Sequence, residues 1–248
     1  MPGPDWITAR PVAHRGLHNN AAGVVENTAS AFAAAIEGGF TIETDLQLSS
    51  DGEAMVHHDF ALGRLTLGSR QLAAMTAAGL KEVPFKATGD RMMTLGELCA
   101  FVAGRVPMLI EVKSRFDGDL RLVRRTVEVV RGYSGPFALM SFDPAPIEAV
   151  RSLAPGIVRG IVAERTYKDS EWRALTDKQK RSLAFLLHFP RTQPHFIAYH
   201  VNDLPSPGPW IARHLLRRPL LAWTVRTDET RKRAEHYADQ MIFEGFRP

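Results

Sequence analysis

The sequence of 248 residues contains one cysteine, Cys99, so an intrachain disulfide is excluded. No window approaches the roughly 18 consecutive apolar residues of a membrane-spanning helix. Residues 1–10 lack the basic start and apolar run of a secretory signal. These absences predict a chain without a transmembrane segment and allow a reducing compartment, and we expect a cytoplasmic location.

A strong charge imbalance is also lacking, because 31 Lys and Arg residues face 27 Asp and Glu residues, a net charge of +4. That excess favours anionic ligands in general without choosing among them. The densest basic run, residues 231–233, has Glu229 and Glu235 beside it and is typical of a solvated helix face. We therefore expect no nucleic-acid partner.

Short apolar runs alternate with longer stretches of helical pattern, as in parallel strands joined by helices. Eight strands are expected, at residues 11–14, 41–48, 108–112, 137–142, 158–162, 196–201, 220–225 and 240–243. The best marked helices are expected at residues 28–37, 120–131, 146–153, 177–187 and 229–238. An open doubly wound sheet would normally carry a Gly-rich phosphate loop after its first strand, and none is present. The pattern predicts an α/β fold of the TIM (β/α)8 barrel type.

The chain length matches the roughly 250 residues of one such barrel, so we expect a single domain over residues 1–248. The long connection at residues 59–107 predicts a small insertion between the second and third strands, with helical pieces at 69–78 and 94–102. Few residues follow the last strand, which predicts a truncated or missing last helix.

Carboxylates mark the ends of two neighbouring strands. Glu43 and Asp45 are two residues apart on a strand, so both point to the same side, and a divalent cation would relieve their repulsion. Glu111 and Lys113 share a face of the next strand and would add a third carboxylate and a cation. Three carboxylates fit Mg²⁺ or Ca²⁺ better than zinc. The alternative readings are an exposed acidic pair and a structural salt bridge.

Histidines lie beside these groups. His14 ends the first strand, and the adjacent Arg15 has a guanidinium suited to binding phosphate. Asp51-Gly52 predicts a two-residue hairpin turn, which would place Asp45 opposite His58 and turn His57 to the other face. Two histidines beside a phosphoryl group make a general acid and base, each worth about 10²- to 10⁴-fold in rate.

Several motifs occur together in one order along the chain. They are His14-Arg15-Gly16, Glu26-Asn27-Thr28, Glu43-x-Asp45, Asp51-Gly52, His58-Asp59, Arg64, Thr94-Leu95, Glu111-x-Lys113, Ser141-Phe142 and Trp223-Thr224-Val225. With them the chain resembles the glycerophosphodiester phosphodiesterase family. The resemblance implies a barrel enzyme that hydrolyses small-molecule glycerophosphodiesters to sn-glycerol 3-phosphate and an alcohol.

The resemblance also assigns roles to residues. It implies that His14 and His58 are the acid/base pair, that one divalent cation, Mg²⁺ or Ca²⁺ with Mn²⁺ as a further choice, is the cofactor, and that Trp223 lines the glycerol pocket or is a core indole. The implied metal ligands are Glu43, Asp45 and Glu111, and the implied phosphate-binding cations are Arg15 and Lys113. Glu26 either approaches the metal or substrate or, as we expect, caps the helix near Thr28.

The chain departs from the family pattern at Val25, Leu65, Arg226 and Glu244-Gly245. Arg226 lies near the expected mouth, where an extra cation would favour a more anionic substrate. Three alternatives stay open: a lysophospholipase D-like enzyme for lipids, a catalytically inactive phosphate-ligand binding barrel, and a barrel that enolises a carbonyl substrate with Lys113 as base. The oligomeric state and the released alcohol are not readable from the sequence.

Overall fold

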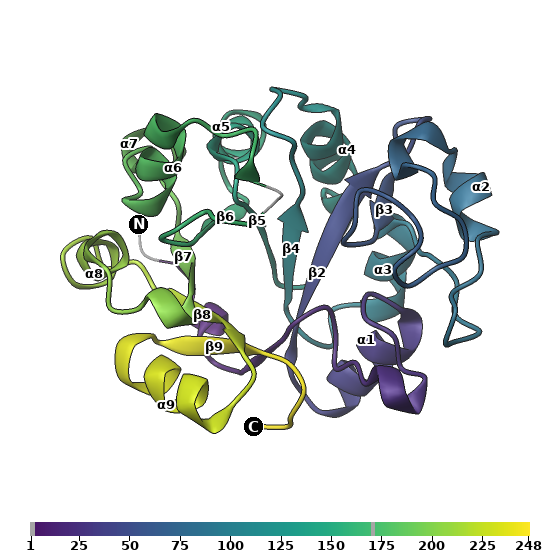
Figure 1. Cartoon of the computed structure of the whole chain (residues 1–248), viewed down its shortest axis with the longest axis horizontal. Helices are drawn as coiled ribbons and strands as arrows, with labels where there is room; N and C mark the ends of the chain where they lie inside the picture. The colour runs from purple at the N-terminus through teal and green to yellow at the C-terminus, as the bar shows by residue number, and fades with distance from the viewer. Residues whose placement is uncertain (1–2, 170–171) are drawn as a thin grey trace.

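The computed structural model describes residues 3–169 and 172–248, and its parallel strands form a closed ring with helices around it (Figure 1). The ring strands are β1 (Val12–Ala13), β2 (Thr41–Leu48), β4 (Met108–Val112), β5 (Phe137–Ser141), β6 (Val158–Ala163), β7 (Phe196–His200), β8 (Leu220–Val225) and β9 (Gln240–Phe243). β1 pairs with both β2 and β9, which closes the ring. The expected TIM barrel is confirmed, with one further strand, β3 (Ala54–Val56), paired antiparallel to the outside of β2.

Helices follow most of the strands. The α-helices are α1 (Ala29–Glu37), α2 (Ala77–Lys81), α3 (Leu95–Val102), α4 (Arg121–Val130), α5 (Pro144–Leu153), α6 (Asp177–Ala184), α7 (Phe189–Thr192), α8 (Pro207–His214) and α9 (Asp228–Tyr237). Short 3₁₀ helices lie at η1 (Asp5–Ile7), η2 (Asn20–Ala22), η3 (Leu72–Ala74) and η5 (Val201–Asp203). All five helices expected outside the insertion are present, with ends shifted by a few residues. The sequence pattern missed α8, whose first turn contains two prolines and a glycine.

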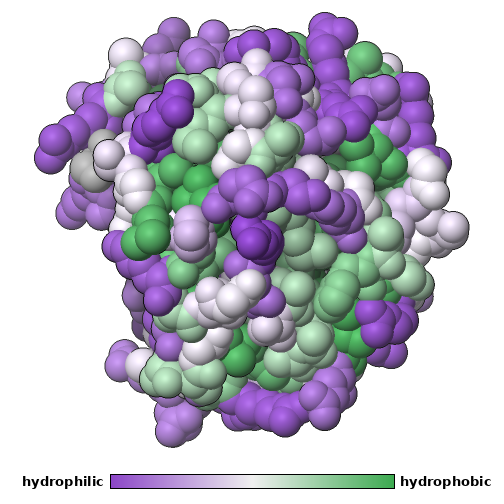
Figure 2. Space-filling model, turned by 90° about the vertical axis from the view of Figure 1, so that its right-hand side faces the viewer, coloured by the Kyte–Doolittle hydropathy of each residue, from purple (hydrophilic) through white to green (hydrophobic). Residues whose placement is uncertain are grey.

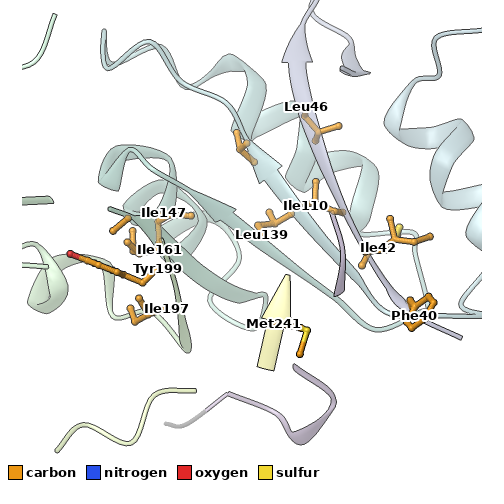
Figure 3. Packing of buried hydrophobic residues seen from close by; sticks show 14 of the residues in the cluster. Phe40, Ile42, Leu46, Ile110, Leu139, Ile147, Ile161, Ile197, Tyr199 and Met241 are labelled. Carbon is orange, nitrogen blue, oxygen red and sulfur yellow. The ribbon is translucent and has the colours of Figure 1, made fainter. Parts of the chain in front are cut away.

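The alternation of side chains along each strand divides the core into two parts. In β4, Leu109 belongs to the apolar cluster inside the ring, whereas Ile110 packs with Ile42 and Leu46 between the ring and the helices (Figure 3). Inside the ring, Phe196 fills the space beside Gly160, where a Cβ atom would lie 2.2 Å from its ring. Even positions of β2 and β4 therefore face the helices, and odd positions face the barrel interior.

The long connection forms a small lobe beside β2. Its own apolar cluster includes Leu62, Leu72, Leu80, Phe85 and Met92. The helix expected at residues 69–78 is wrong: η3 ends at Ala74, and α2 begins only after Thr76, whose hydroxyl accepts the amide of Gly79 as an N-cap. The helix expected at 94–102 is confirmed as α3, with a capping box between Thr94 and Glu97.

The β2–β3 hairpin has a different register from the one expected. Leu46 pairs with Val56, and the backbone amide of His57 donates to the carbonyl of Asp45. The turn contains three residues instead of two, with Gly52 at a φ of 83°, because Ser49 pairs with Glu53 across it. The prediction that Asp45 lies opposite His58 is therefore wrong by one residue.

Beyond β9, the described residues to Pro248 contain no further helix, in agreement with the missing last helix. In the described part of the chain, no helix has the length and apolar character needed to cross a membrane.

Candidate active site

Three carboxylates meet inside the ring, two on the middle of β2 and one near the carboxyl end of β4. Asp45 pairs in register with Glu111, and Glu43 lies two residues earlier on the same inward face of β2. One oxygen from each of the three carboxylates lies within 4.8 Å of the others. All three residues are at least 94% buried, with relative exposures of 1%, 1% and 6% for Glu43, Asp45 and Glu111. Strand pairing thus concentrates negative charge where little water can reach it.

Two cations oppose this charge. Lys113 Nζ lies 2.9 Å from Asp45 Oδ1 and 2.8 Å from Glu111 Oε1. Burial alone would lower the pKa of Lys113, but Asp45 and Glu111 outweigh it and raise that pKa above its ordinary value. Arg15 Nε lies 3.3 Å from Asp45 Oδ2, and the Arg15 backbone amide donates to Glu43 Oε2 at 2.9 Å. Both cations therefore stay charged beside the cluster.

The cluster still has more negative than positive charge. Burial, Asp45 and Glu111 raise the pKa of Glu43 well above its ordinary value, whereas Lys113 and His58 hold the pKa of Asp45 below its usual range against the effect of burial. The three buried carboxylates offer only oxygen donors, and the raised pKa of Glu43 disfavours its charged form. This set matches the donors of a hard divalent cation. Glu43, Asp45 and Glu111 thus fit a metal ion on chemical grounds.

His14 follows β1 and bonds to a carboxylate from the other end of the chain. Its Nδ1 lies 2.5 Å from Glu244 Oε2, and its Nε2 lies 3.9 Å from Glu43 Oε2. The bond to His14 helps to lower the pKa of Glu244 despite burial, so Glu244 is an acceptor and Nδ1 of His14 is the donor. Burial lowers the pKa of His14 to about 4. His14 is therefore neutral at pH 7, with Nε2 unprotonated.

His58 has its own chain of partners. Its Nδ1 lies 2.8 Å from Asp59 Oδ1, and Asp59 Oδ2 accepts from Arg64 Nε at 2.6 Å. Arg64 also donates two bonds to Glu26, which accepts a further bond from Arg15 Nη1 at 2.7 Å. These hydrogen bonds link His58 to Arg15, whose guanidinium lies beside the carboxylate cluster.

The expectation that Glu26 caps the first helix is wrong, since its carboxylate is engaged by the two arginines. Thr28, the N-cap residue of α1, makes no capping bond with its side chain. Instead Asp90, from the lobe, accepts the amide of Ser30 at 3.2 Å. Because Asp90 is distant from α1 in the chain, the local sequence does not predict this cap.

A cavity of about 280 Å³ opens above these groups at the carboxyl ends of the strands. The indole of Trp223 lies on its wall, with ring centroids 5.3 Å from Phe142 and 5.1 Å from His200. Among the described residues the Trp223 indole N–H has no hydrogen-bond partner. The ionisable residues that line the cavity are His14, Arg15, Glu43, His58, Glu111, Lys113, Glu164, Asp169, His200 and Arg226.

The structure brings together all eight predicted site residues: seven line the cavity, and Asp45 lies with Glu43 and Glu111 in the carboxylate cluster. Arg226 lines the cavity, and its Nε lies 2.5 Å from Glu244 Oε1, so its role as an extra cation for the substrate stays a prediction. Sequence reasoning missed the contact of Glu244 with His14. The signal was present: Glu244 directly follows the last barrel strand and departs from the family pattern.

Comparisons with known proteins agree with this geometry. A model described as the glycerophosphoryl diester phosphodiesterase family matches residues 14–244. A curated glycerophosphodiester phosphodiesterase from Caldanaerobacter subterraneus subsp. tengcongensis is 29% identical over 161 residues, which are 61% of this chain and 65% of the relative. The match thus spans just under two thirds of that relative's length.

Solved structures share the fold. A phosphodiesterase from Oleispira antarctica, in complex with the product sn-glycerol-3-phosphate, gives a TM-score of 0.76 at 19% identity and covers 94% of this chain and 91% of its own. A glycerophosphodiester phosphodiesterase from Thermotoga maritima gives 0.70 at 22% identity and covers 94% of each chain. The family match runs from His14, after the first barrel strand, to Glu244, after the last, and the chain belongs to the glycerophosphoryl diester phosphodiesterase family.

Proposed function

We propose that this protein hydrolyses glycerophosphodiesters to sn-glycerol 3-phosphate and an alcohol with the help of one divalent cation. The observation that carries the proposal is the buried triad of Glu43, Asp45 and Glu111 at a cavity that His14 and His58 also line. The curated relative bears the name of this activity, and the Oleispira antarctica structure holds its product. Mg²⁺ or Ca²⁺ suits the oxygen donors, with Mn²⁺ as a further choice.

The carboxylate triad would hold the cation, which when bound supplies positive charge to the phosphate oxygens. Arg15 and Lys113 add fixed positive charge on the same side and orient the phosphate. Trp223 lies on the wall of the cavity, where its indole would contact the glycerol part of the substrate.

Proton transfer falls to the two histidines. One imidazole removes the proton from the nucleophile, which is water or the neighbouring glycerol hydroxyl, and the other donates a proton to the departing alkoxide. Each histidine has a carboxylate on Nδ1, Glu244 for His14 and Asp59 for His58, so each keeps Nε2 for the reaction. The two imidazoles are thus oriented by matching contacts.

The lipid alternative receives little support from the lobe. Of the large apolar side chains exposed in the described residues, only Leu67 belongs to the connection at 59–107. Figure 2, which views the molecule from the side of this lobe, shows hydrophilic and hydrophobic residues interspersed. A site in the aqueous phase and a cytoplasmic location are our proposals.

The test is turnover of glycerophosphocholine with Mg²⁺, Ca²⁺ and Mn²⁺ in turn, with products identified by phosphorus NMR. We expect glycerol 3-phosphate, and a loss of about 10²- to 10⁴-fold in kcat for His14→Ala and for His58→Ala. His236→Ala, at an exposed histidine of α9, is the matched control. Undiminished turnover in both site variants would refute the assignment, and a binding barrel without catalysis would give no product with any cation.

A further inference from the structure

A second cavity, of about 240 Å³, lies beside the carboxylate triad. It shares Glu111, Lys113 and Phe142 with the central cavity, so the two meet at the metal-binding side of the site. The central cavity contains the polar groups and Trp223. A diester placed at the triad therefore has two different compartments for its two alcohol parts.

The second cavity has an aromatic and aliphatic wall, and Ser114, Arg115 and Ser141 complete its lining beside the shared Glu111 and Lys113. The wall comes from four loops at the carboxyl ends of successive strands: Phe60 after β3, Phe116 after β4, Phe142 after β5, and Trp172 with Leu175 after β6. The Trp172 ring centroid lies 4.9 Å from that of Phe142 and 6.1 Å from that of Phe116. These mutual contacts hold the rings in place before any ligand arrives.

Two further packing contacts stabilise the aromatic side chains of this wall. Trp172 and Leu175 pack with Tyr167, which is fully buried, in a separate apolar cluster. At the opposite rim the Arg115 guanidinium lies 4.1 Å from the centre of the Phe60 ring. An apolar ligand would complement such a wall.

We propose that this compartment binds the departing alcohol and that the preferred alcohol carries an aromatic ring or a similarly compact apolar group. The inference rests on the proposed function, since it takes the carboxylate triad as the reaction centre. A cavity of roughly 150 Å³ suffices for benzene. The compartment thus has room for an aromatic ring and a short linker to the phosphate. A long acyl chain would be too large for it and would extend beyond the cavity.

The experiment compares the ethyl and 2-phenylethyl diesters of glycerol 3-phosphate. Their alkoxides are of similar basicity and the same bond is cleaved, so the ratio of kcat/KM reports the contact made by the ring. We expect the 2-phenylethyl ester to be preferred by about tenfold or more, the gain from burying one aromatic side group. In Ala174→Phe, which introduces a ring at the lining of the compartment, the ratio should fall towards one. Ala100→Phe, at an exposed position of α3, is the matched control and should keep the ratio of the unaltered protein.

Equal kcat/KM values for the two esters in the unaltered protein would overturn the inference and leave the proposed function standing. So would a preference that survives in Ala174→Phe. If neither ester nor glycerophosphocholine is cleaved with any cation, the proposed function itself fails, and this inference fails with it.

Discussion

The contact between His14 and Glu244 permits a sharp prediction. In Glu244→Gln the side chain keeps its length, and its amide oxygen can still accept from His14 Nδ1, but its negative charge is lost. The bond measures 2.5 Å in the structure, and Arg226 holds the other carboxylate oxygen. The substitution therefore removes the negative charge beside Nδ1 of His14, and it also replaces the oxygen that accepts from Arg226 with an amide NH₂ group.

The size of the effect follows from the kind of bond. A hydrogen bond to a charged group contributes about 1.5 to 3 kcal/mol, compared with about 0.5 to 1.5 kcal/mol for a neutral one. The negative charge of Glu244 stabilises the His14 imidazole most strongly when that imidazole is protonated. Removing the charge should therefore raise the free energy of the transition state. With about 1.36 kcal/mol for each factor of ten, we expect kcat to fall by about 10-fold, and by no more than about 70-fold, the ratio for a difference of about 2.5 kcal/mol. KM should change little, because the contact is not made to the substrate.

The assay is steady-state release of glycerol 3-phosphate from glycerophosphocholine at saturating cation. His14→Ala and the double variant complete a cycle, in which the Glu244→Gln effect should vanish once the imidazole is gone. A nitrogen NMR spectrum should show the Nδ1–H tautomer of His14 in the unaltered protein and a mixture in the variant. The matched control is Glu235→Gln, at an exposed carboxylate of α9 that pairs with Arg231.

A kcat for Glu244→Gln within twofold of the unaltered protein, together with a large loss in His14→Ala, would refute the reasoning. An equal effect of Glu244→Gln in the presence and absence of the imidazole would also refute it, since Glu244 would then act by another route.

Three further predictions follow from the packing and the charges. Gly160→Ala should lower the free energy of unfolding in urea by about 1 to 3 kcal/mol, because its Cβ would meet the Phe196 ring; unchanged stability would contradict this. The pKa of Glu26 is lowered from 4.5 to about 2, so its stabilisation is present above pH 4.5 and is lost as the pH falls towards 2. The advantage of the unaltered protein over Glu26→Gln in urea unfolding should therefore be about 2 kcal/mol smaller at pH 3 than at pH 6, and a constant advantage would count against the arginine contacts. Dialysis against EDTA should abolish turnover, and addition of Mg²⁺ or Ca²⁺ should restore it. Glu43→Gln should weaken cation binding measured by calorimetry. Activity that survives chelation would exclude a role for the cation in turnover.

The barrel was predictable because its strands are nearly continuous apolar runs that differ clearly from the helical stretches between them. Local turn chemistry was harder to read. The Asp51-Gly52 pair indicates a hairpin, but the extra residue in the turn depends on the pairing of Ser49 with Glu53, which the sequence does not reveal. The helix α8 was missed because Pro207 and Pro209 suggest a loop, although a proline at the start of a helix costs little.

The site was predictable where residues follow strand parity. Glu43, Asp45, Glu111 and Lys113 lie on one inward face because neighbouring parallel strands keep a common alternation. Contacts between loops have no such rule. The partners of Glu26, and the approach of Glu244 to His14, depend on how distant segments are brought together by closure of the ring.

Closure of the ring at β1 also bears on how the protein matures. β1 contains only two residues, yet it alone joins β2 to β9, and the next residue, His14, bonds to a carboxylate 230 positions away. Such a distant pairing has a high entropic cost and forms late in folding. During synthesis, His14 cannot bond to Glu244 until β9 has left the ribosome. A partly made chain would carry most of the acidic triad but lack the oriented imidazole, so the protein should become active only when its barrel is closed.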